Sequence, residues 1–117
     1  MYEYNAVITS VYDGDTATCT LDLGFGIHIT KAKLRLHGIN TAELRGGTAE
    51  EKERGYAARD WLRDQIMDKK VRVRSKKKGK YGRYLAVIWQ LDSKGEVVGD
   101  SLNDRLIELG HATAYLV

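Results

Sequence analysis

The chain has 117 residues, of which 43% are hydrophobic and 30% are charged, and its formal net charge is +3. These proportions are those of an ordinary globular protein and exclude a chain that is disordered throughout. The length favours a single domain, residues 1–117, and the single cysteine, Cys19, excludes an internal disulfide.

The first third of the chain alternates polar and apolar residues, as β-strands do. Three strands are expected, at residues 2–12, 16–23 and 27–37, with turns at residues 13–15 and 24–26. An antiparallel meander of this kind is typical of small β-barrels.

The middle of the chain is expected to contain a loop and then a helix. Residues 38–53 have no periodicity and include two adjacent glycines, which predicts a loop. Residues 48–51 match a capping box, but apolar residues at helical spacing begin later. The helix is therefore expected at residues 55–68.

The last third predicts two more strands and a second helix. Val71 and Val73 alternate with arginines, residues 76–80 form a turn, and residues 84–91 form the fifth strand. A second capping box at residues 101–104 opens a helix that ends at Gly110. This order of elements predicts an α+β fold, a five-stranded barrel with two or three α-helices. Barrels of this size are commonly OB-folds, which bind oligonucleotides.

Positive charge is concentrated in one segment. Residues 69–83 hold nine lysines and arginines and no acid, which leaves 10 basic and 16 acidic residues elsewhere. A basic stripe on an acidic body predicts a polyanionic partner, DNA or RNA. The alternative is a solvated lysine-rich hairpin that only protects an edge strand.

Three polar motifs follow or precede the predicted strands, at residues 13–16, 35–43 and 81–83. Together they supply a carboxylate for a hard cation, a second carboxylate that could act as a base, and two arginines. In-line attack of water on a phosphodiester requires these groups.

The motifs resemble those of the staphylococcal nuclease (thermonuclease) family, over about residues 11–115. They are Asp-Gly-Asp-Thr, Arg-Leu-x-Gly-Ile-x-Thr-x-Glu and Tyr-Gly-Arg, followed by the closing helix, in this order. The resemblance implies an SNase-like OB-fold and a Ca²⁺-dependent endo- or exonuclease that acts on DNA and RNA and leaves 3′-phosphates.

The resemblance also implies roles for individual residues in catalysis. Arg35 and Arg83 would bind the phosphate and stabilise the transition state, since guanidinium groups bind phosphate oxygens bidentately. Glu43 would be the general base that deprotonates the attacking water. A solvated loop glutamate and a salt-bridged strand arginine are the alternatives.

Metal and substrate contacts are implied in the same way. Ca²⁺ takes oxygen ligands, which Asp15, Asn40 and the Thr41 carbonyl would supply. Asp13 is better suited to holding the turn through its own backbone. The implied substrate contacts are Lys80, Tyr81 and Tyr115.

Two positions depart from the family pattern. Asn40 stands where the family most often carries aspartate, which removes a negative charge and predicts weaker Ca²⁺ binding. The other interpretation of Asn40 is a site that has lost its metal. Ala42 replaces the usual proline, which predicts a slightly looser segment at residues 40–43.

The sequence shows no membrane or leader segment. No apolar run approaches the roughly 20 residues that cross a bilayer, and the first residues lack a basic and an apolar leader region. We expect no membrane association, a cytoplasmic location if Met1 is the native start, and secretion if a leader was removed. Since no coiled-coil seam is present, a monomer without an obligate protein partner is expected.

The predicted function is therefore a small metal-dependent nuclease. The alternative is a catalytically degenerate module that binds nucleic acid or protein, which Asn40 favours. Against it, a binding module needs no base, yet Glu43 and both arginines are present. A barrel that binds single strands by stacking alone should contain more than 9% aromatic residues.

Overall fold

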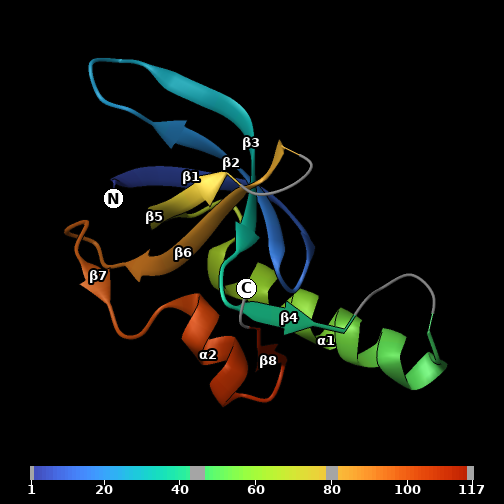
Figure 1. Ribbon diagram of the computed structural model, residues 1–117. Coiled ribbons are helices and arrows are strands. Elements are labelled where there is room, and N and C mark those ends of the chain that lie inside the picture. Colours follow the sequence, from blue (N-terminus) through green and yellow to red (C-terminus); the bar gives the residue numbers. More distant parts are fainter. Residues whose placement is uncertain (1, 43–46, 79–81, 116–117) are drawn as a thin grey trace.

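The structure is a computed structural model that describes residues 2–42, 47–78 and 82–115, with only the backbone described for Lys77 and Lys78 (Figure 1). Its centre is a closed barrel of five strands. These are β1 (Glu3–Asp13), β2 (Thr16–Asp22), β3 (His28–Leu36), β5 (Lys70–Lys78) and β6 (Tyr84–Leu91).

The order of the strands is that of an OB-fold. Antiparallel pairs join β1 to β2, β2 to β3, β1 to β5 and β5 to β6, and a parallel pair of β3 with β6 closes the barrel. The α+β barrel predicted from the sequence is therefore confirmed.

Two helices and three short strands complete the described fold. The helices are α1 (Ala49–Ile66) and α2 (Leu102–Glu108). The short strand β7 (Val97–Val98) extends the sheet beside β6, whereas β4 (Ile39–Thr41) and β8 (Ala112–Ala114) form a separate two-stranded sheet. In Figure 1, β4 and β8 lie below the barrel, between the two helices. The short strands were not predicted, because two or three residues carry too little periodicity.

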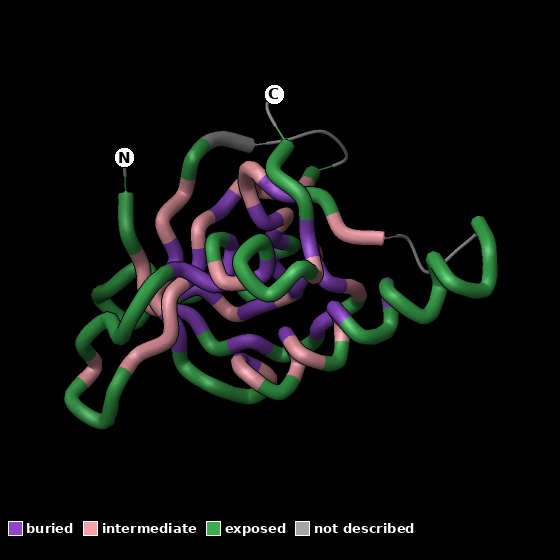
Figure 2. The backbone as a smooth tube through the Cα atoms, turned by 90° about the horizontal axis from the view of Figure 1, so that it is seen from below, coloured by how far each residue is buried: buried purple, intermediate pink, exposed green. Residues whose placement is uncertain are grey.

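Helix α1 begins six residues earlier than its apolar spacing predicted. The Thr48 hydroxyl caps it by accepting a hydrogen bond from the Glu51 N–H at 3.2 Å. Residues 49–54 are all exposed, so packing against the core does not stabilise this part of the helix. The Thr48 cap and two glutamates in the first turn stabilise it. Figure 2 shows this end of α1 projecting from the body of the molecule. The predicted loop at residues 38–53 was therefore wrong where β4 and the start of α1 lie.

The barrel interior and the inner faces of both helices form one core (Figure 2). From the helices, Leu62, Ile66, Leu102 and Leu106 are fully buried against it. Cys19 of β2 also lies in this core, and burial raises the pKa of its thiol to about 12. The thiol therefore stays protonated at neutral pH and takes no part in chemistry there. In the part of the chain that the structure describes, neither helix is long and apolar enough to cross a membrane.

Candidate active site

The turn between β1 and β2 is held by Asp13, as the sequence predicted. The Asp13 Oδ1 atom accepts a hydrogen bond from the Asp15 N–H at 3.1 Å, which is the contact of an Asx turn. Burial, followed by the neighbouring Asp15 carboxyl group, raises the pKa of Asp13 to about 6. The turn thus places two carboxyl groups side by side, and Asp15 is only 7% exposed.

Gly14, in the same turn, packs where two other segments meet. A Cβ atom at this position would lie 2.7 Å from the Ala58 Cβ of α1 and 2.8 Å from the Thr41 Cγ2 of β4. These distances are shorter than real Cβ contacts, so the turn approaches helix and strand this closely only because residue 14 is glycine. Sequence reasoning missed this role, since the three segments are far apart in the chain.

We expect Gly14→Ala to lower the free energy of unfolding by about 1–3 kcal/mol, the usual cost of overpacking. Urea denaturation measures this change. In an Ala58→Gly background, which removes the nearest atom, the same substitution should cost less. An equal cost in both backgrounds would show that the contact with Ala58 is not its origin.

Arg35, at the end of β3, contacts two of the other predicted site residues. Its Nη2 donates to the Asn40 Oδ1 at 2.8 Å, and its Nη1 lies 3.5 Å from the Asp15 Oδ2. The same Asp15 oxygen accepts the Thr41 N–H at 3.3 Å. The structure therefore brings together Asp15, Arg35, Asn40 and Thr41, which we call the central cluster.

The geometry of the strands explains this cluster. Arg35 pairs with Thr16 of β2, so its side chain lies beside the turn that carries Asp15. The chain then turns at His37 and Gly38 into β4, which returns Asn40 and Thr41 to the same place. Arg35 is anchored there by its Nη1, which also donates to the Leu36 carbonyl at 2.8 Å.

The central cluster fits a hard divalent cation by the type of its donors. The Asp15 carboxylate, the Asn40 amide oxygen and the Thr41 carbonyl are all oxygen ligands, which such cations prefer. Among the described residues, no group of three or more His, Cys, Asp or Glu side chains could hold a metal ion. Binding of a cation here would therefore depend on amide and backbone oxygens in addition to Asp15. The positive charge of Arg35 partly neutralises the negative charge of the Asp15 carboxylate.

Two further predicted residues lie near this end of the barrel. Arg83 directly precedes β6, whose first residue, Tyr84, pairs with Leu34 beside Arg35. Tyr115 follows β8, is 47% exposed, and donates its N–H to the Gly38 carbonyl at 2.8 Å.

The remaining predicted residues lie outside the described part of the chain. They are Glu43, Lys80 and Tyr81. Their roles stay predictions from the sequence.

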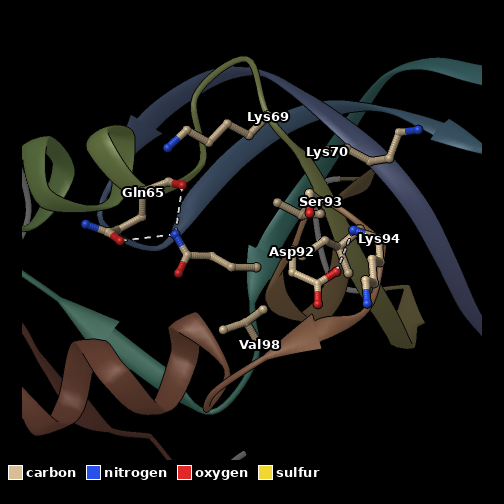
Figure 3. A pocket seen from close by; sticks show the side chains of 11 residues that line it. Gln65, Lys69, Lys70, Asp92, Ser93, Lys94 and Val98 are labelled. Atoms are coloured by element: carbon tan, nitrogen blue, oxygen red, sulfur yellow. Dashed lines mark hydrogen bonds between the residues drawn. The ribbon is translucent and has the colours of Figure 1, made fainter.

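A cavity of about 670 Å³ lies elsewhere, between the end of α1, the start of β5 and the turn after β6 (Figure 3). Some of its polar groups bond to one another. Gln90 Nε2 donates to the side-chain oxygen of Gln65, and Asp92 Oδ1 accepts the N–H of Lys94. None of the predicted site residues is among the described residues that line this cavity, so the candidate site is the central cluster and not this cavity.

Comparison with known proteins agrees with the topology of the barrel. A family model described as Staphylococcal nuclease homologue matches residues 33–117, which is most of the chain and includes Arg35, Asn40 and Thr41. A comparison with curated proteins gives no match. On the extent of the family match and on its OB-fold barrel, the chain belongs to the staphylococcal nuclease family.

Proposed function

We propose that the protein is a Ca²⁺-dependent nuclease that hydrolyses phosphodiester bonds of DNA or RNA and leaves 3′-phosphates. The observation that carries the proposal is the contact of the Arg35 guanidinium with Asp15 and Asn40. In this proposal the guanidinium that would bind phosphate lies beside the oxygen atoms that would bind the metal ion. Membership of the family supports the hydrolytic chemistry.

Asp15, Asn40 and the Thr41 carbonyl would hold the Ca²⁺ ion. When bound, the ion would act as a Lewis acid that withdraws charge from the scissile phosphate.

Arg35 has the donors to bind that phosphate. Its two hydrogen bonds within the structure, to Asn40 and to the Leu36 carbonyl, use two of its five N–H groups. The other N–H groups can donate to phosphate oxygens as charge builds up in the transition state. Arg83, beside the start of β6, would supply the second guanidinium.

Glu43 is the proposed general base. It follows Thr41 of β4 by two residues, so the chain reaches it directly after the central cluster. Its carboxylate would take a proton from the attacking water. Lys80, Tyr81 and Tyr115 are the proposed substrate contacts, and the basic residues at 69–83 would concentrate nucleic acid on the surface.

The test is cleavage of denatured DNA and of RNA by the purified protein while Ca²⁺ is titrated from micromolar to millimolar concentrations, with EDTA as control. We expect Ca²⁺-dependent digestion. Its products should be extended by a polymerase only after treatment with a phosphatase, because their 3′ ends carry phosphate. Binding of nucleic acid without cleavage in Ca²⁺, Mg²⁺ or Mn²⁺ would identify the binding module instead.

Asn40 offers a direct test of the metal site. Asn40→Asp should lower the Ca²⁺ concentration that gives half-maximal activity, because a second carboxylate increases the charge of the ligand set. Asn5→Asp is a matched control, since Asn5 Oδ1 also accepts from an arginine, Arg72 Nε at 2.8 Å, but between β1 and β5. An unchanged or higher midpoint for Asn40→Asp would show that Asn40 does not face the metal.

A further inference from the structure

A second cavity, of about 460 Å³, lies directly beside the central cluster. It is bounded by β4, by α1 and by the segment that leads into β8. It shares Asn40 and Thr41 with the cluster and adds residues to which no role has been given. We call it the α1 groove, and its lining also includes Ala42, Arg54, Ala57 and residues 110–113.

Arg54 is the charged side chain of the α1 groove. It is exposed, and within the described part of the chain it takes part in no hydrogen bond or ion pair. Other arginines of α1 are engaged: Arg59 pairs with Asp60 at 2.9 Å, and Arg63 donates to the Val11 carbonyl at 2.8 Å. The guanidinium of Arg54 is therefore available for a ligand, with all five of its donors.

The opposite wall of the α1 groove is formed by the first two residues of β8 and the two residues before them. Thr113 pairs with Asn40 across the two-stranded sheet, which ties this wall to the central cluster. His111 is half-buried, and its ring lies against Trp61 with 5.9 Å between the ring centroids. This packing stabilises the position of the His111 ring beside the cavity.

The charge of the α1 groove suits an anion. Among the residues that the structure describes, none of those lining it is acidic, whereas Asp92 lines the cavity of about 670 Å³, and Asp100 and Asp104 line another of about 440 Å³. Its volume lies within the range of small-molecule sites, about 300–1,000 Å³. The described lining residues therefore place no negative charge between a phosphate group and Arg54.

We propose that the α1 groove is a substrate subsite that holds the nucleotide next to the scissile phosphate, with Arg54 bound to the phosphate of that nucleotide. The proposal rests on the proposed function, because the shared residues Asn40 and Thr41 place the groove beside the reacting phosphate. In this subsite Arg54 makes a contact that a substrate with a single phosphodiester cannot make. Affinity then depends on the length of the strand.

The experiment measures binding in EDTA, where no cleavage occurs, by the fluorescence anisotropy of labelled single-stranded oligonucleotides. The probes are a dinucleotide with one phosphodiester and a hexanucleotide. Arg54→Ala should weaken binding of the hexanucleotide about tenfold, as expected for loss of a charge-assisted hydrogen bond. Binding of the dinucleotide should not change. The control is Arg59→Ala, on the same helix but outside the groove, which should bind both probes as the wild type does.

The dependence on salt identifies the bound group as a phosphate. Loss of one phosphate contact should reduce the slope of log affinity against log salt by about 0.7 for the single strand. Arg54→Lys should restore the slope, because the charge is kept. An unchanged affinity and slope in Arg54→Ala would overturn the subsite, and so would an equal loss for both probes.

The subsite and the nuclease activity fail separately. If the hexanucleotide is bound through Arg54 but is not cleaved in Ca²⁺, Mg²⁺ or Mn²⁺, the nuclease proposal is wrong and the subsite stands. If the wild type cleaves and Arg54→Ala binds both probes normally, the subsite is wrong and the nuclease proposal stands.

Discussion

Arg35→Lys is expected to lower kcat/KM for phosphodiester cleavage by about 10²–10³-fold, the usual cost of losing an electrostatic contact made in the transition state. Lysine keeps the charge but cannot bind two phosphate oxygens with a planar fork. It also loses the geometry by which Arg35 contacts both Asn40 and the Leu36 carbonyl at 2.8 Å. The charged group would therefore no longer be fixed beside Asp15.

Steady-state kinetics on denatured DNA at saturating Ca²⁺ measures this effect. The control is Arg59→Lys, the same substitution at an exposed pair with Asp60 on α1. Circular dichroism and urea denaturation establish that both variants fold. If the two variants cleave at similar rates, Arg35 has no special role in the transition state.

Glu43→Gln is expected to lower kcat by about 10²–10⁴-fold, the range for loss of a general base. Glutamine has nearly the shape of glutamate but cannot accept the proton of the attacking water. The affinity for nucleic acid should change little, because the base contacts the water and not the strand.

The two quantities are measured separately, kcat in Ca²⁺ and the dissociation constant in EDTA. Glu53→Gln, an exposed glutamate of α1, is the control for the loss of one negative charge. Unchanged turnover in Glu43→Gln would remove Glu43 from the role of base. A parallel loss of binding would point to a structural role.

The barrel could be predicted from the sequence because its five strands are long and alternate. The parts that could not be predicted have physical reasons. Residues 49–54 form an exposed start of the helix in which Ala49 is the one apolar residue, so hydrophobic spacing gives no signal there. Strands β4 and β8, at three residues each, are defined by pairing with each other and not by any local pattern.

For the candidate site, motifs identified the residues but not their contacts. The structure brings Asp15, Asn40 and Thr41 together around Arg35, whereas the hydrogen bond from Arg35 to Asn40 depends on side-chain conformations that no motif contains. The same limit applies to Gly14. A Cβ atom at this position is excluded by Ala58 and Thr41, which lie far from it in the sequence. Nothing in the sequence singles out Arg54, because it belongs to no motif. Only the structure shows that it lines the α1 groove.

Closure of the barrel has a consequence for how the protein folds. The parallel pair that joins Leu34 to Tyr84 connects residues about 50 positions apart, whereas hairpins such as β1–β2 close locally. The β1–β5 pair of Val7 with Lys70 is also non-local, and the entropy of closing both loops must be offset, so we expect both contacts to form after the local hairpins. Arg35 pairs with Leu85 where β3 joins β6. Closure brings the start of β6, and with it Arg83, to the end of the barrel that holds the central cluster. We therefore expect cleavage to recover during refolding later than secondary structure.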